Sequence, residues 1–234
     1  MTGPVTGVHI RSFSDALAEG LRPTFQAISD LVEPAVVLAK APDTDGAFES
    51  SLAMLDAACR AGLTLEPELL HGAGYMAEPE VIADADYWAR WWWRTPAGEL
   101  QVGEHALDPA NDAFYDYPST EWFTALRDGE DDTVFGPYVD FNGTNDYTVT
   151  LARAVRLDGV FLGSVGGDIT VSALERRFEP ILRDLGVPAL LANEENRVVI
   201  STDAQWTAGS RLRASSSRPQ QSYDLAPWTL VVFD

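Results

Sequence analysis

The sequence predicts an α+β fold in which helices pack on a mainly antiparallel sheet. Residues 12 to 39 carry apolar side chains at helical spacing, and residues 47 to 61 do so again. Residues 87 to 105 and 135 to 168 instead form short runs rich in aromatic and β-branched residues, separated by turn signals. An antiparallel meander backed by helices is therefore the expected architecture.

The N-terminal helical pattern contains two prolines. Its apolar stripe comprises Phe13, Leu17, Leu21, Phe25, Ile28, Leu31 and Val32. We expect Pro23 and Pro34 to start, kink or stop the helix, because proline has no backbone N–H to donate. The second helix, over residues 47 to 61, is expected to end at Gly62.

The first strands follow a less regular stretch. Residues 63 to 80 are mixed in character, and Gly72 and Gly74 are expected to allow tight turns there. Residues 87 to 94 and 100 to 105 are typical of two strands joined by a turn.

Tryptophans dominate the first of these strands. Because alternate residues of a strand share a face, Trp91 and Trp93 should point one way and Trp92 the other. Packing is the favoured role for these rings, since aromatic side chains dominate core burial.

Three further strands are expected at residues 135 to 141, 146 to 156 and 159 to 168. Residues 142 to 145 and 158 to 159 have the composition of hairpin turns between them. An acidic run at 128 to 132 precedes these strands and is expected to be a solvated surface loop.

The C-terminal part is expected to be mostly β. Strands are predicted at residues 189 to 192, 197 to 202 and 228 to 233. Residues 206 to 221 are polar, and residues 215 to 219 within them are expected to form a mobile loop.

Composition argues against several classes of partner. The chain has 234 residues, 16 basic and 36 acidic, with a net charge of −20, which disfavours nucleic acids and anionic membranes and mildly favours cationic ligands. The single cysteine, Cys59, excludes an internal disulfide or a multi-thiolate metal site. Since neither a signal peptide nor a long apolar run is recognisable, a cytoplasmic protein is expected.

Aromatic rings and carboxylates recur together between Phe114 and Thr170. The order of features along the chain runs from the N-terminal helix and the two strands to a Trp-Phe pair, a Gly-Pro-Tyr strand and a strand ending in Gly-Asp-Ile. This order resembles that of a Cache domain. That is the PAS-like sensor module of bacterial chemoreceptors and histidine kinases. The resemblance implies a Cache-type ligand-binding domain over residues 10 to 185. Residues 186 to 234 would then be a C-terminal β extension or a vestigial second module.

The resemblance also implies a binding site. In the amino-acid-binding branch of the family, the pocket is built from a Tyr, an Arg-x-Trp-Tyr segment, a Tyr-x-Asp and a final Asp. The corresponding residues here are Tyr115, Thr120, Trp122, Phe123, Tyr138, Asp140 and Asp168. Phe123 lacks the hydroxyl of the family's Tyr, and Thr120 stands where the family has its carboxylate-binding Arg. Arg127, or Arg90 or Arg94 from the Trp-rich strand, could replace that Arg only from a different direction.

The lost Arg changes the ligand we expect. A desolvated carboxylate needs a bidentate donor such as Arg, and Thr120 cannot serve as one. Asp140 and Asp168 can bind an ammonium group, and the rings of Tyr115, Trp122 and Tyr138 can face a cation. The sequence therefore predicts a non-enzymatic sensor for a small amine: primary, diamine or quaternary. A homodimer contact through the first helix and a downstream signalling protein of unknown identity are expected partners.

Three alternatives remain open from the sequence. The first is an amino-acid sensor, and the second is an enzyme that uses paired carboxylates, although the three histidines are scattered and no nucleophile motif is present. The third is an interaction module whose pocket binds nothing. No cofactor or metal is expected, since Asp140, Asn142 and Asp146 match a calcium loop only in part.

Overall fold

The computed structural model describes residues 6–42, 46–83, 85–140, 146–212, 220–225 and 227–233. The helices are α1 (Gly7–Ser29), α2 (Val32–Ala39), α3 (Ala47–Leu65), α4 (Glu121–Asp128) and α5 (Val171–Arg183), with a 3₁₀ turn at Tyr117–Ser119. The strands are β1 (Leu70–Ala77), β2 (Ala89–Arg94), β3 (Leu100–Val102), β4 (Asp132–Val139), β5 (Tyr147–Leu157), β6 (Val160–Thr170), β7 (Ala189–Ala192), β8 (Val198–Ser201), β9 (Gln220–Leu225) and β10 (Trp228–Phe233).

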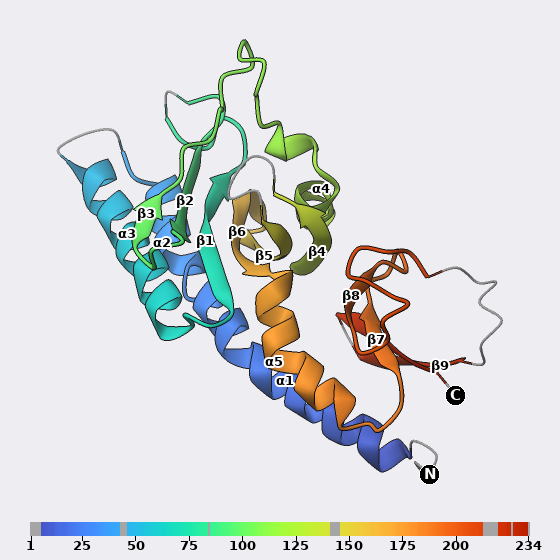
Figure 1. The fold of residues 1–234 in the computed structure, drawn as a ribbon. Helices are drawn as coiled ribbons and strands as arrows, with labels where there is room; N and C mark the ends of the chain where they lie inside the picture. The colour runs from blue at the N-terminus through green and yellow to red at the C-terminus, as the bar shows by residue number, and fades with distance from the viewer. Residues whose placement is uncertain are drawn as a thin grey trace.

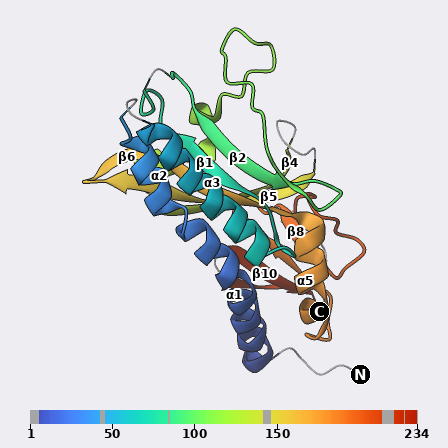
Figure 2. The ribbon, with the colours of Figure 1, turned by 90° about the vertical axis from the view of Figure 1, so that its left-hand side faces the viewer.

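Six strands form the main sheet in the order β3-β2-β1-β6-β5-β4, and every neighbouring pair is antiparallel. Helices α1, α2 and α3 pack on one face, as Figure 2 shows, and α4 contacts β4, β5 and β6. The apolar core lies between the sheet and the helices and includes the fully buried Tyr75, Leu55 and Phe178. The α+β fold predicted from the sequence is confirmed.

The C-terminal strands form a second sheet, ordered β8-β7-β10-β9 (Figure 1). Helix α5 runs beside α1 and connects the two sheets. A hydrogen bond 2.8 Å long, donated by Asn193 Nδ2 to the Gly136 carbonyl, links the second sheet to β4. The boundary predicted between residues 185 and 186 falls between α5 and β7.

The N-terminal helix differs from its prediction. It begins at Gly7 and ends at Ser29, and α2 starts at Val32, so the predicted helix over 12 to 39 is two helices. Pro34 lies in the first turn of α2, where no helical N–H is needed, whereas Pro23 is inside α1.

Gly62 does not end α3, which continues to Leu65. A Cβ on Gly62 would lie 3.2 Å from the Cβ of Ala27, so the glycine allows α1 and α3 to approach closely.

The predicted turns at Gly72 and Gly74 are also wrong. Both glycines lie inside β1, a central strand of the main sheet. The acidic run at 128 to 132 ends in the first residue of β4. Strand β9 was not predicted; its first two residues belong to the stretch expected to be polar, and it pairs along its whole length with β10.

Some expectations concern residues outside the described ranges, namely the turn at 142 to 145 and the mobile loop at 215 to 219. Cys59 is fully buried. In the parts of the chain that the structure describes, no helix is both long enough and apolar enough to cross a membrane.

Candidate ligand-binding site

A small cavity of about 30 Å³ lies on the face of the main sheet opposite α3. Strands β1, β2, β5 and β6 form its floor, and β4, α4 and the segment preceding α4 surround it. The residues that line it are Met76, Trp91, Trp93, His105, Tyr115, Trp122, Tyr138, Asp140, Thr150 and Asp168.

Strand register brings the polar centre of the cavity together. Thr150 on β5 lies opposite Asp168 on β6. The Thr150 hydroxyl donates to Asp168 Oδ1 at 2.6 Å and lies 2.8 Å from the Tyr138 hydroxyl. Because the single proton of Thr150 goes to the carboxylate, Tyr138 donates to Thr150. Tyr138, Thr150 and Asp168 therefore form one hydrogen-bonded chain.

Trp91 reaches Asp168 by crossing β1. Its indole Nε1 donates to Asp168 Oδ2 at 3.0 Å, although the two residues belong to β2 and β6. A Cβ on Gly72 would lie 2.8 Å from that nitrogen, and one on Gly74 would lie 2.6 Å from Trp91 Cε3. The two glycines are thus required where they stand, because any side chain there would occupy the volume of the ring.

The carboxyl group of Asp168 has a raised pKa in this cavity. Burial, opposed by the Thr150 and Trp91 hydrogen bonds and assisted by the nearby Asp140, raises the pKa of Asp168 to about 7. An unpaired buried anion is costly. A cation bound beside Asp168 would therefore favour its ionised form.

The phenols and the imidazole of the cavity favour their neutral forms. Burial raises the pKa of the Tyr115 and Tyr138 phenols, so both stay protonated. Burial also lowers the pKa of His105, with Asp140 opposing the shift. The His105 ring stacks on Tyr115 at a centroid distance of 5.7 Å. The cavity therefore offers neutral rings, two carboxyl groups and hydroxyls.

The structure brings five of the seven predicted site residues to this cavity: Tyr115, Trp122, Tyr138, Asp140 and Asp168. Thr120 and Phe123 do not line it. Thr120 precedes α4 as its N-cap residue, and its hydroxyl donates to the Tyr117 carbonyl at 2.7 Å. Phe123 is fully buried against Phe161, so its missing hydroxyl has no bearing on the cavity.

None of the three candidate arginines faces the cavity. Arg127 binds Glu78 through its Nε and Nη2 atoms at about 3 Å. Arg90 makes a bidentate pair with Asp56 of α3 at 2.7 and 2.6 Å, and Arg94 donates to the Leu63 carbonyl. The described lining of the cavity holds no Lys or Arg.

Five lining residues were not predicted: Met76, Trp91, Trp93, His105 and Thr150. The alternation of the tryptophans was correct, since Trp92 points to α3 and donates to Asp56 at 2.6 Å. That same alternation places Trp91 and Trp93 on the cavity face. His105 and Thr150 carried no signal in the sequence, because only the register and the loop path bring them to Asp168 and Asp140.

The cavity offers no evident metal centre. Among the described residues, no group of three or more His, Cys, Asp or Glu side chains is placed to hold a metal ion. Asn142, part of the partial calcium pattern, lies outside those residues. Asp168 is also not the cap of α5, since Thr170 accepts the Ala173 N–H at 3.2 Å.

Comparison with solved structures confirms the fold. One similar structure is described as methyl-accepting chemotaxis protein X, at 16% identity, a TM-score of 0.59, and coverage of 98% of this chain and 99% of the other. Another is the ligand-binding domain of the Pseudomonas fluorescens chemoreceptor CtaA with L-serine, at 17% identity, a TM-score of 0.52, and coverage of 95% and 92%. A third is that of the Pseudomonas aeruginosa amino acid chemoreceptor PctC with GABA, at 13% identity, a TM-score of 0.55, and coverage of 96% of each.

The chain therefore has the fold of the Cache-type sensor domains found in chemoreceptors and histidine kinases. Of the three structures compared above, one is described as a chemotaxis protein and two as ligand-binding domains of chemoreceptors. No protein-family model and no curated protein matches the sequence. One similar structure is described as the extracellular domain of a histidine kinase. The fold therefore lends no support to the cytoplasmic location, which stays a prediction.

Proposed function

We propose that the protein is a sensor module that binds a small amine in the cavity around Asp168. One observation carries the proposal: the described lining combines two carboxyl groups with aromatic rings and contains no Lys or Arg. A charge-assisted hydrogen bond to Asp168 would contribute about 1.5–3 kcal/mol. A cation against a buried ring would contribute about 2 kcal/mol more.

The size of the cavity favours a small ligand. A volume of about 30 Å³ is enough for roughly two water molecules. Methylammonium is close to that size, while larger amines require the lining to move. The Trp91 side chain, which is 5% exposed and lies over Gly72 and Gly74, fills part of the floor.

The alternative ligand is an α- or γ-amino acid. Similar domains are described in complex with L-serine and with GABA. Against this alternative, the arginines nearest in the sequence are bound to Glu78, Asp56 and Leu63. A ligand carboxylate in the cavity would thus have no guanidinium partner among the described lining residues, and hydroxyl and ring N–H donors would offset its desolvation less well than an Arg.

Matched ligand pairs separate the two alternatives. Ethanolamine is L-serine without its carboxylate, and butylamine is GABA with a methyl group in place of its carboxylate. In a thermal-shift assay at about pH 8, we expect ethanolamine, butylamine or methylammonium to raise the melting temperature of the protein. Stabilisation by L-serine or GABA alone would contradict the proposal.

Two variants locate the effect. Asp168→Asn keeps the shape of the side chain and removes its charge, so it should abolish the amine-dependent shift. Glu99→Gln is the control, since Glu99 is an exposed acid in the turn between β2 and β3. If both variants keep the shift, the amine binds elsewhere. The predicted homodimer and downstream partner stay predictions.

A further inference from the structure

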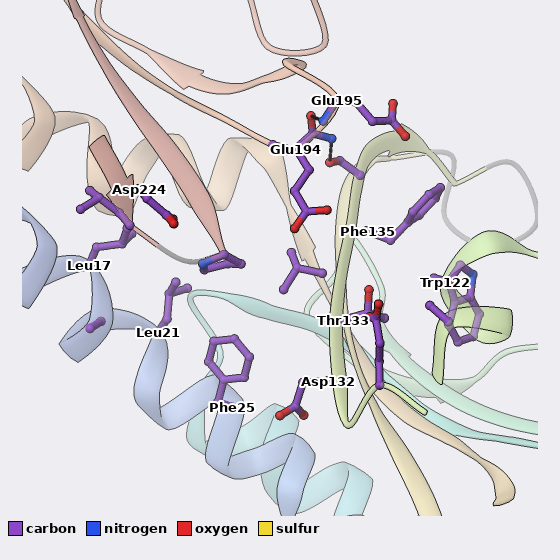
Figure 3. A pocket seen from close by; sticks show the side chains of 18 of the residues that line it. Leu17, Leu21, Phe25, Trp122, Asp132, Thr133, Phe135, Glu194, Glu195 and Asp224 are labelled. Atoms are coloured by element: carbon purple, nitrogen blue, oxygen red, sulfur yellow. Dashed lines mark hydrogen bonds between the residues drawn. The ribbon is translucent and has the colours of Figure 1, made fainter. Parts of the chain in front are cut away.

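A second, much larger hollow lies between the two sheets. Its volume is about 920 Å³, within the size range of small-molecule sites. Helix α1, helix α4 and strand β4 form one side of it, and residues of the second sheet form the other (Figure 3). The structure thus contains a ligand-sized hollow distinct from the cavity around Asp168.

The floor of the hollow is apolar. Leu17, Leu21 and Phe25 follow one another at intervals of four residues and so share one face of α1. Val134 of β4 and Leu225 of β9 line it as well. In Figure 3, the rings of Phe25 and Phe135 and the side chain of Leu21 lie around the open centre. A solvent-accessible apolar concavity of this kind favours a ligand with an apolar body.

The rim of the hollow is acidic. Its carboxylates are those of Glu121, Glu130, Asp132, Glu194, Glu195 and Asp224, and the one basic side chain in the described lining is Arg22. Arg22 itself lies 3.5 Å from Glu19. Arg153 pairs with Asp132, and Arg211 pairs with Glu195. Glu194 is exposed, and its carboxylate points into the hollow in Figure 3.

The hollow and the cavity share a wall. Trp122 lines both of them. Phe135 lines the hollow and Tyr138 lines the cavity, and their ring centroids are 5.3 Å apart. The bond from Asn193 to the Gly136 carbonyl anchors the second sheet at the same point of β4. A ligand in the hollow would therefore contact the back of the cavity wall.

We propose that this hollow is a second binding site, and that it takes an organic cation with an apolar body, such as an aryl- or alkylammonium ion. The apolar body would lie on the α1 and β4 residues, and the ammonium would face the carboxylates of the rim. The size and the apolar floor carry the proposal, and the single sign of charge along most of the rim selects the cation. It does not rest on amine binding at Asp168.

Dansylcadaverine is a suitable probe, because it joins an environment-sensitive aromatic ring to a primary ammonium. We expect its fluorescence to increase and shift to shorter wavelength when the full chain is added. Dansylamide carries the same ring without the cation and should bind more weakly. Added salt should weaken dansylcadaverine binding, since rim charges accessible to solvent are screened.

Variants assign the probe to the hollow. Glu194→Gln should weaken dansylcadaverine binding by about two- to fivefold, the range for a solvent-accessible charge pair, and Glu194→Lys should weaken it further. Glu104→Lys is the control, because Glu104 is also exposed but does not line the hollow. Asp168→Asn should leave the binding unchanged.

Three results would overturn the proposal: no fluorescence change, equal binding of dansylamide, or loss of binding in Asp168→Asn. The last would place the probe in the first cavity. Because Glu194 is exposed and lies in a turn, its variants should fold, and a circular-dichroism melt checks this directly. Failure of this test leaves the amine site at Asp168 to be judged by its own thermal-shift result.

Discussion

Asp168 makes a quantitative prediction about stability. Its carboxyl has an ordinary pKa of 3.8, which the folded protein raises to about 7, chiefly by burial. The folded state therefore binds more protons than the unfolded state across this interval, and stability falls as the pH rises through it. A shift of about three pH units corresponds to on the order of 4 kcal/mol between its two extremes.

The measurable part lies between about pH 5 and about pH 8. Over that interval Asp168 should lower the free energy of unfolding by about 2.5 kcal/mol. In Asp168→Asn this contribution is absent, so the free energy of unfolding should decline less with pH than in the natural protein. The substitution also leaves an amide near the Trp91 N–H, which costs about 1 kcal/mol at every pH.

Urea titrations followed by tryptophan fluorescence give the free energy of unfolding of each protein, the natural one and Asp168→Asn, at each of the two pH values. Taking the difference between the two proteins removes the contributions of His71, His105 and Glu175, whose pKa values are also shifted. Equal pH dependence in the two proteins would refute the account of Asp168 as a buried carboxyl of raised pKa.

Three other substitutions test neighbouring contacts. Thr150→Val removes the hydroxyl between Tyr138 and Asp168, so it should lower the free energy of unfolding in a urea titration by about 1–3 kcal/mol. Amine binding should then need a higher pH, and an unchanged pH midpoint of binding would contradict the hydrogen-bonded chain. Gly72→Ala places a methyl group 2.8 Å from Trp91 Nε1. It should lower the free energy of unfolding by about 1–3 kcal/mol and reduce the amine-dependent rise in melting temperature. An unaffected rise would show that the indole is not held there. Phe123→Ala should lower the free energy of unfolding by about 3–5 kcal/mol without changing ligand preference. A changed preference would show that Phe123 does contribute to the binding site.

Matched controls exist for Gly72→Ala and Phe123→Ala. Gly7→Ala adds the same methyl group at a glycine with no atom within 4 Å of the new Cβ, so it should leave stability and binding nearly unchanged. Leu126→Ala removes another fully buried side chain of α4 and should lower stability without altering the choice between amine and amino acid.

Local sequence signals predicted much of the β structure. The alternation of Trp91, Trp92 and Trp93 gave the correct faces of β2, because a strand has a strict period of two. Strands β5 and β6 were located to within two residues. Where local and tertiary signals disagreed, the prediction failed. Gly72 and Gly74 indicate turns locally, yet they are strand residues because the ring of Trp91 needs their empty positions.

The candidate site was predictable only in part. Tyr138, Asp140 and Asp168 could be found from the order of family motifs along the chain. Thr120 was misplaced because its motif position does not imply that its short side chain reaches the cavity; it bonds to Tyr117 instead. His105 could not be found, since its approach to Tyr115 depends on the path of the segment after β3.

Whether an ammonium group binds at Asp168 is decided most directly by a crystal structure of the protein grown with the amine that stabilises it most. We expect the ligand nitrogen within hydrogen-bond distance of an Asp168 oxygen, with aromatic rings of the cavity around it. An amine bound only in the hollow between the sheets, or a bound amino acid whose carboxylate is held by an arginine, would contradict this expectation.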